Sequence, residues 1–223
     1  MADARPSLRL PVTLAPDLSE PDAFRLRARR ALFEEPLDPQ RDAERFGCHV
    51  IASILPEPEF WDKAKPAAVL VPVVQRAEGL NLVLTERSAG LSTHAGQVAF
   101  PGGRIEPGES AGVAALREAE EEIGLPPVEV EPIGFLPPYF SGTGFRVQPL
   151  VGLVSPEVRF APDPGEVARV FEVPLALVLD PARYRRGEIF WRGRERSFYI
   201  LDYAEAYIWG VTAGIMRNFA ERF

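Results

Sequence analysis

The sequence predicts an α/β protein in which a mixed β-sheet is sandwiched between α-helices. The apolar run at residues 67–74 indicates a buried strand, and residues 80–85 form its hairpin partner across a polar turn. Helical patterns at 110–123 and 203–219 alternate with further strand patterns. Such an order of strands and helices fits layers of helix packed on a sheet.

The first 66 residues are predicted to be an N-terminal arm and helical extension, followed by a domain at 67–223. Residues 1–20 contain several prolines and little periodicity, which is typical of an irregular arm. A helix is expected from Pro21 to a point before Pro36, with an arginine-rich exposed face. Whether this extension builds a homodimer stays open.

The rest of the chain is expected to supply the other elements of the layers. A short strand at 49–55 precedes the main domain, and nearby Cys48 and His49 are interpreted as structural residues. Within the domain, the expected elements are strands at 128–135, 145–154, 167–173 and 194–201 and a short helix at 175–179.

The helix expected at 110–123 has clear end signals. Ser110 can cap its N-terminus, and Gly124 followed by Pro126 can end it. At about 100° per residue, one small-residue face can pack closely against the sheet. That face consists of Gly112, Ala115, Leu116, Ala119 and Ile123.

Beside this face, Glu118 and Glu122 are expected to project together, with Glu121 flanking them. A like-charge pair at this spacing destabilises an isolated helix by about 0.2–0.5 kcal/mol. A divalent cation would balance the charge, since Mg²⁺ is typically held by one or two protein carboxylates and by substrate phosphates. The alternative is a solvated acidic face, although ordinary exposed faces mix in cations and this one offers only Arg117.

The segment 103–125, GRIEPGESAGVAALREAEEEIGL, resembles the Nudix box, G-x5-E-x7-R-E-U-x-E-E-x-G-U, where U is aliphatic. Ala119 takes the first U position, where a larger aliphatic residue is common. The fixed positions that match are Gly103, Glu109, Arg117, Glu118, Glu121, Glu122, Gly124 and Leu125. The resemblance implies a metal-dependent hydrolase of compounds that contain a diphosphate, with Mg²⁺ or Mn²⁺ as cofactor.

The stretches 84–88 and 94–103 are similar to an additional motif of the coenzyme A diphosphatase branch of that family. The similarity makes Arg87, His94 and Gln97 candidates for binding the nucleotide end, including a 3′-phosphate. Alternatively, Arg87 pairs with Glu86 or a box glutamate, and His94 is a packed turn residue. The aromatic loop 139–145 either lines the substrate channel or is an ordinary packed loop.

Roles follow from the box. Glu118 and Glu122 are the first candidates for metal ligands, with Glu121 as a third ligand, the holder of a metal-bound water or the general base. Glu166, in a proline-bounded loop before a strand, is the other candidate base. Arg117 is expected to hold Glu109 or a box carboxylate by a charge-assisted bond rather than to touch substrate.

Two consecutive glycines precede the helix expected at 110–123. Gly102 and Gly103 are expected to let the backbone approach phosphate or metal, or simply to form a turn.

The net charge of -7 and a pI near 5.1 disfavour a nucleic-acid partner. The sequence has no apolar run of about 18 residues and no secretory signal core, so no membrane partner and a cytoplasmic location are expected.

The leading hypothesis is hydrolysis of coenzyme A or its derivatives to adenosine 3′,5′-bisphosphate and 4′-phosphopantetheine or its acylated form. A second hypothesis keeps the chemistry and changes the substrate to ADP-ribose, a dinucleotide or a nucleotide sugar. A third is a nucleotide-binding sensor without catalysis, against which the retained box carboxylates speak.

Overall fold

The computed structural model describes residues 20–38, 47, 62–91, 94–191 and 194–223. At its centre lies β1 (Lys65–Arg76), whose apolar residues are mostly buried. β1 pairs in parallel with β7 (Phe145–Val154) and antiparallel with β2 (Gly79–Arg87). The predicted hairpin is therefore confirmed, and β1 has hydrogen-bonded neighbours along both edges.

The main sheet is mixed, as predicted, because β1 and β7 run parallel while the other pairs are antiparallel. Its strands follow the order β3, β2, β1, β7, β5, and three further strands pair with members of this path. β4 pairs with β1, β6 with β7, and β8 with β2. The remaining bounds are β3 (Val98–Ala99), β4 (Gly102–Arg104), β5 (Val130–Phe135), β6 (Tyr139–Phe140) and β8 (Val167–Pro174).

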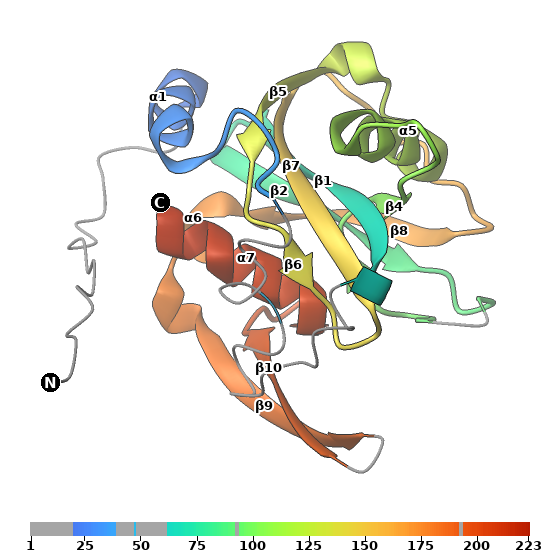
Figure 1. Ribbon diagram of the computed structural model, residues 1–223. Helices are drawn as coiled ribbons and strands as arrows, with labels where there is room; N and C mark the ends of the chain where they lie inside the picture. Colours follow the sequence, from blue (N-terminus) through green and yellow to red (C-terminus); the bar gives the residue numbers. More distant parts are fainter. Residues whose placement is uncertain (1–19, 39–46, 48–61, 92–93, 192–193) are drawn as a thin grey trace, which may run out of the picture.

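Helices cover both faces of this sheet (Figure 1). Alternate residues of β1 point to opposite faces: Ala68 and Leu70 pack with α5 (Ala111–Ile123), and Val71 and Val73 pack in the other hydrophobic cluster. On that second face lie α1 (Pro21–Ala31), α6 (Leu175–Val178) and α7 (Gly210–Arg222). The α/β/α arrangement expected from the sequence is thus confirmed.

A second sheet of three strands joins β9 (Tyr184–Trp191), β10 (Arg194–Leu201) and β11 (Ile208–Trp209). The strand expected at 194–201 is confirmed as β10. β9 was not predicted, because Arg185, Arg186 and Glu188 hide the apolar alternation that marks a half-buried strand.

The prediction of a helix from Tyr203 is wrong at its beginning. Ile208 and Trp209 instead pair with β10, and α7 begins at Gly210, whose φ of 67° suits glycine. Burial of Ile208 beside β10 stabilises the strand over the helix that the local pattern favours. Between the second sheet and β8, η2 (Pro181–Arg183) forms a short 3-10 turn, as η1 (Pro127–Glu129) does after α5.

The N-terminal helix is confirmed as α1, which ends well before Pro36. Its Phe24 is fully buried against Phe219 and Phe223 of the C-terminal region. The predicted strand at 49–55, with Cys48 and His49, lies outside the described residues. Among the helices that the structure describes, none combines the length and apolar character needed to span a bilayer.

Candidate active site

The ends of α5 are set by local sequence, as predicted. Ser110 precedes the helix in an extended conformation, and its hydroxyl accepts a hydrogen bond from the Val113 N–H at 3.3 Å. At the other end, Gly124 adopts the left-handed conformation with φ of 63°. A side chain at Gly124 would also collide with Ala161, so this glycine lets a following loop lie against the helix.

The buried face of α5 differs from the predicted face. Gly112 and Leu116 are only partly buried. The buried residues of the helix are Ala114, Ala115, Ala119, Glu122 and Ile123. A carboxylate therefore lies on the face that packs on the sheet, and Glu122 is only 4% exposed. An ionised group in such a place requires partners, because burial removes its hydration.

The glycine pair of β4 provides the surface against which both carboxylates lie. The Gly102 N–H donates to Glu122 Oε2 at 3.1 Å. A β-carbon at Gly103 would overlap the carboxylate of Glu118. In this structure the groups that approach these glycines closely are the two glutamates. A contact of either glycine with substrate remains a prediction.

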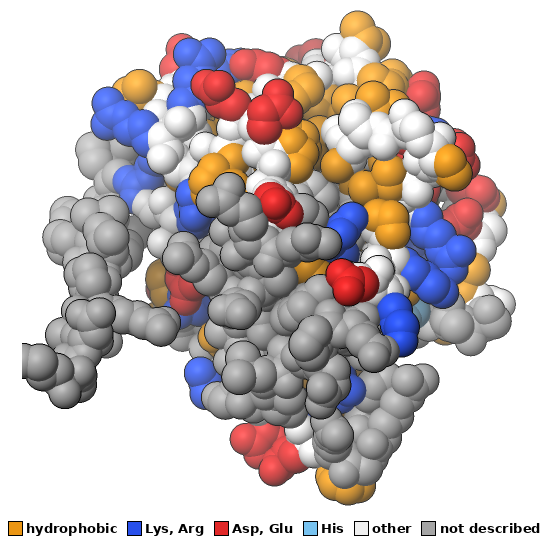
Figure 2. Space-filling view, viewed as in Figure 1, with side chains coloured by type: hydrophobic (Ala, Val, Ile, Leu, Met, Phe, Trp, Pro, Cys, Tyr) orange, Lys and Arg blue, Asp and Glu red, His pale blue; other side chains and the backbone are white. Residues whose placement is uncertain are grey.

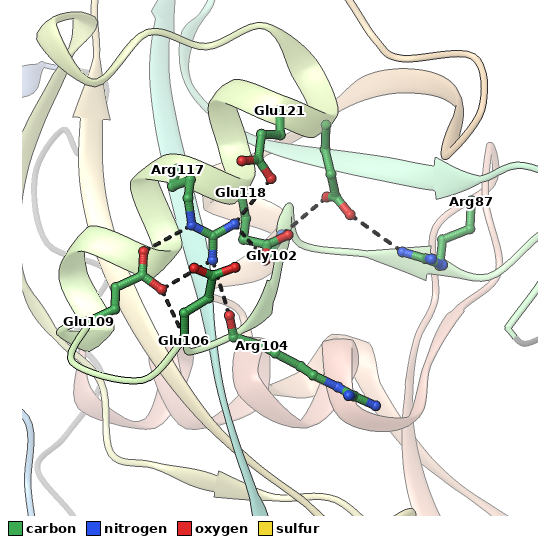
Figure 3. A network of polar contacts seen from close by, with 9 residues as sticks. Arg87, Gly102, Arg104, Glu106, Glu109, Arg117, Glu118 and Glu121 are labelled. Carbon is green, nitrogen blue, oxygen red and sulfur yellow. Dashed lines mark hydrogen bonds and ion pairs between the residues drawn. The ribbon is translucent and has the colours of Figure 1, made fainter.

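Arg117 joins Glu109, Glu118 and Glu121 into one network (Figure 3). Its guanidinium donates to both oxygens of Glu109 at 2.9 and 3.1 Å, to Glu118 at 3.0 Å and to Glu121 at 3.1 Å. It also donates to the Arg104 carbonyl at 3.2 Å. The bonds from Arg117 hold the pKa of Glu109 below its usual value. Arg117 therefore positions the box carboxylates, as expected from the sequence.

Arg87, at the end of β2, faces Glu122. Its NH1 lies 3.4 Å from Glu122 Oε1, so the alternative that it pairs with a box glutamate describes this structure. The strand–loop–strand segment that follows brings Gln97 back, and the Arg87 N–H donates to the Gln97 carbonyl at 3.0 Å. His94 Nδ1 is 2.8 Å from Gln97 Oε1. Figure 3 shows Arg87 across from the Arg117 network, with Gly102 between them.

The loop that carries Glu166 is tied to the C-terminal end of α5. The Asp163 N–H donates to the Glu122 carbonyl at 2.9 Å, and the Ser88 N–H donates to the Glu166 carbonyl at 2.8 Å. The charge of Glu166 raises the pKa of both Glu118 and Glu122. The structure thus brings this carboxylate near the box acids, although 44 residues separate Glu166 from Glu122 in the sequence.

Two residues that hold this loop were missed by sequence reasoning. Ser88 donates its hydroxyl to the Pro164 carbonyl at 2.9 Å, and Asp163 accepts from the Gly165 N–H at 2.8 Å. The Asp-Pro-Gly run is a turn signal that could have identified Asp163. Nothing in the sequence around Ser88 indicates that it reaches this loop.

The surroundings of Glu118 and Glu122 disfavour their ionised forms when no cation is bound. Burial, chiefly, raises the pKa of Glu122 to about 7, with further contributions from Glu166 and Glu118. Burial also raises the pKa of Glu118, against the opposing effect of Arg117. Arg87, at 3.4 Å, is a long partner for so buried a carboxylate. A divalent cation at Glu118 and Glu122 would supply the charge that these acids lack.

Glu118, Glu121 and Glu122 are held by arginines rather than grouped around one point. Within the described ranges, no three His, Cys, Asp or Glu side chains are already arranged around a metal position. Arg117 instead holds Glu118 and Glu121, and Arg87 holds Glu122. Carboxylate oxygens are the ligand type that a divalent ion such as Mg²⁺ takes, and these side chains would turn from the arginines to hold one.

The loop 139–145 is packed, as one of its two interpretations expected. Tyr139 and Phe140 are almost fully buried, and the Tyr139 ring lies against Gly214 of α7. Ser141 is also buried, and its hydroxyl accepts from the Phe145 N–H at 2.9 Å. The buried rings of Tyr139 and Phe140 stabilise the core.

A family model described as the NUDIX domain matches residues 64–191, more than half of the chain. The chain belongs to the Nudix family. An uncharacterized Nudix hydrolase NudL of Citrobacter koseri is 48% identical over 157 residues, covering 70% of this chain and 81% of that protein. NudL of Escherichia coli K12 is 46% identical over the same lengths. The chain is thus a Nudix hydrolase, a class that acts on pyrophosphate bonds of nucleoside diphosphate-linked compounds and generally uses divalent metal ions.

Solved Nudix structures align with part of the chain. An Ap4A hydrolase of C. elegans is 21% identical and has a TM-score of 0.44, covering 49% of this chain and 80% of that one. The NUDIX domain of Shewanella oneidensis NrtR, crystallised with ADP ribose, is 18% identical and has a TM-score of 0.41. The alignment covers 64% of this chain and 87% of that one.

Proposed function

We propose that this Nudix hydrolase cleaves the diphosphate bond of coenzyme A or its derivatives with Mg²⁺ or Mn²⁺. The products would be adenosine 3′,5′-bisphosphate and 4′-phosphopantetheine or its acylated form. The observation that carries the proposal is that Arg87, within the motif that resembles coenzyme A diphosphatases, lies 3.4 Å from the buried box carboxylate Glu122. His94 and Gln97 of the same motif are bonded to each other, and the Gln97 carbonyl accepts from the Arg87 N–H.

Glu118, Glu122 and Glu121 are proposed to hold the metal. When bound, a divalent cation neutralises the diphosphate and lowers the pKa of a water molecule. Gly102 fixes Glu122 through its N–H, Gly103 leaves space for Glu118, and Arg117 orients Glu118 and Glu121. These contacts set where the carboxylate oxygens lie before the substrate arrives.

Hydrolysis requires that an oxygen of water attacks one phosphorus, that the bridging P–O bond breaks and that a proton leaves the water. Glu166 is the proposed acceptor, because its charge acts on both Glu118 and Glu122 and its loop is anchored to α5. Glu121 is the second candidate. Its side chain is the most exposed among the box glutamates, and Arg117 donates a hydrogen bond to it at 3.1 Å.

Substrate identity is tested by parallel assays of coenzyme A, ADP-ribose, a dinucleotide and a nucleotide sugar with Mg²⁺ and with Mn²⁺, with product analysis. We expect the highest kcat/KM for coenzyme A or an acyl derivative. Turnover of ADP-ribose at least as fast as that of coenzyme A would reject the coenzyme A assignment. Tight nucleotide binding without turnover of any compound would instead favour the sensor hypothesis.

A prediction for Arg87 concerns the 3′-phosphate. With the charge of Glu122 balanced by a cation, the Arg87 guanidinium is free to face this group. We expect Arg87→Ala to lower kcat/KM for coenzyme A by about 10- to 100-fold, as for other charge-assisted bonds, and that for dephospho-coenzyme A much less. Equal losses for the two substrates would contradict a 3′-phosphate contact.

A further inference from the structure

The strand β9 is an open edge of the second sheet. Among the described strands it pairs only with β10, and β10 separates it from β11. The β9–β10 hairpin extends away from the main sheet at the lower end of the molecule (Figure 1). An edge strand presents unpaired N–H and C=O groups, which can pair with a strand of another chain.

Along β9, the side chains of Arg185, Arg186, Glu188, Ile189 and Phe190 are exposed. Phe190 is 75% exposed and Ile189 is 46% exposed. Arg185 binds Asp202 at 2.8 Å, whereas Arg186 and Glu188, both exposed, make no ion pair with any described residue. Figure 2 shows acidic and hydrophobic side chains on the lower rim, where Figure 1 places this hairpin.

Arg186 and Glu188 are two residues apart, so they lie on one face of β9 together with Tyr184 and Phe190. Consider two copies of β9 that pair antiparallel with the two Gly187 residues opposite each other. Arg186 of each copy then faces Glu188 of the other, whereas Tyr184 takes no part, because its hydroxyl donates to the Val178 carbonyl at 2.6 Å and its ring packs against the core. Opposite charges placed directly across from each other in this way stabilise a strand pair.

The neighbouring registers that keep the same faces together lack this complementarity. A pairing centred on Glu188 places the two Glu188 side chains opposite each other, and one centred on Arg186 does the same for Arg186. Like charges directly opposite each other destabilise a strand pair. The charge pattern of β9 therefore selects the Gly187 register.

We propose that a second copy of this chain binds along β9, antiparallel and centred on Gly187, so that the three-stranded sheets of the two copies become continuous. The contact spans residues 184–190 of each strand. Such a strand contact is small compared with stable dimer interfaces, which bury about 1,200–2,000 Å², so the dimer is expected to be weak and dependent on concentration. The proposal is independent of the substrate assignment.

Charges on an edge strand also serve in other proteins to prevent strand pairing. That role requires only that charges be present, whereas self-pairing requires that they alternate in the correct order. Arg186→Glu makes this face of β9 acidic in both positions, and Glu188→Arg makes it basic in both. Each variant alone would then face like charges, while a mixture of the two would face opposite charges.

The test is analytical ultracentrifugation of the full chain from about 1 µM to about 1 mM, the range in which small interfaces associate. We expect the unmodified chain to dimerise with rising concentration and Arg186→Glu and Glu188→Arg to remain monomers. The equimolar mixture of the two variants should form a heterodimer. The double variant R186E/E188R, which restores the pairing with the charges exchanged, should dimerise again.

Circular dichroism and thermal unfolding of each variant check that the monomers are folded. A variant that does not fold is replaced by Arg186→Gln or Glu188→Gln, and each of these should also weaken the dimer. A chain that stays monomeric over the whole range would overturn the proposal. So would dimerisation of folded Arg186→Glu at the unmodified affinity, or failure of the two single variants to associate when mixed.

Discussion

The absence of a side chain at Gly103 leaves room for the Glu118 carboxylate, which would overlap a β-carbon at that position. We expect Gly103→Ala to displace Glu118 from Arg117 and to lower kcat at least tenfold, which corresponds to about 1.4 kcal/mol. The fold should persist, because the displaced atoms are the end of a flexible side chain. Steady-state kinetics and thermal unfolding provide the measurement.

Gly90→Ala is the matched control, because a β-carbon there meets no atom within 4 Å. It should leave both kcat and the melting temperature near their original values. Normal kcat in Gly103→Ala would show that the position of Glu118 is not set by this contact.

Glu122 combines a catalytic prediction with a stability prediction. Its raised pKa, about 7 against an ordinary value of 4.5, means that the folded chain prefers the protonated form. The associated stability is fully present below pH 4.5 and is lost as the pH rises through 7. Each pKa unit corresponds to about 1.4 kcal/mol, so the rise in pKa from 4.5 to about 7 means that ionised Glu122 destabilises the metal-free chain by at most about 3.5 kcal/mol.

We therefore expect Glu122→Gln to raise the melting temperature in EDTA at pH 8 and to change it little at pH 4.5. The same variant should lower kcat by orders of magnitude, since an amide is a poor metal ligand. Glu120→Gln, on the exposed side of α5, serves as the control and should alter neither property. Near-normal turnover in Glu122→Gln would reject its role as a metal ligand.

At the scale of elements, the position of the acids depends on where α5 begins. Ser110 caps the helix through its bond with Val113, and the chain places no acidic residue in the first turn to assist it. We expect Ser110→Ala to lower the free energy of unfolding by about 0.5–2 kcal/mol, and Ser110→Asp to retain the cap. Urea denaturation of the unmodified protein and of the two variants measures these free energies. Equal decreases in the free energy of unfolding for Ser110→Ala and Ser110→Asp would indicate that Ser110 has a role other than capping.

The site itself is made by the meeting of separate elements. β4 supplies the glycines, α5 the box acids, the end of β2 supplies Arg87, and the loop before β8 supplies Glu166. The strands of this set are joined in the main sheet through β1 and β2, so the side chains are positioned by regular hydrogen-bonded structure. Sites built on such elements hold their geometry better than sites on loops alone.

At the scale of the whole molecule, α1 shares a hydrophobic cluster with α7. Phe24 stacks on Phe223 with ring centres 5.4 Å apart, and Arg25 donates to Glu131 of β5. We expect Phe24→Ala to lower the free energy of unfolding by about 3–5 kcal/mol. Leu26→Ala on the same helix, where the side chain is 61% exposed, should change it little.

Chemical denaturation followed by both circular dichroism and hydrolase activity measures these changes. Coincident transitions would mean that the N-terminal extension and the catalytic domain unfold as one unit. If Phe24→Ala leaves the stability of the core unchanged, residues 20–38 form a separate attachment, and the predicted boundary at 66 and 67 is the better description.

Local patterns in the sequence determined the β1–β2 hairpin, the two ends of α5 and the residues of the Nudix box. Each of these depends on neighbours within a few positions: alternating or continuous apolar residues, a capping serine, a left-handed glycine. The sequence of α5 alone was enough to identify its clustered glutamates and to predict that a cation balances their charge.

Only the tertiary structure decided the partners of those acids and the course of the chain after β8. Burial of Glu122, its contact with Arg87 and the approach of Glu166 join residues that are far apart in sequence, so no local pattern encodes them. The helix predicted from Tyr203 gave way to β11 for the same reason. Pairing with β10 and burial of Ile208 outweigh helix propensities that amount to less than about 1 kcal/mol per residue.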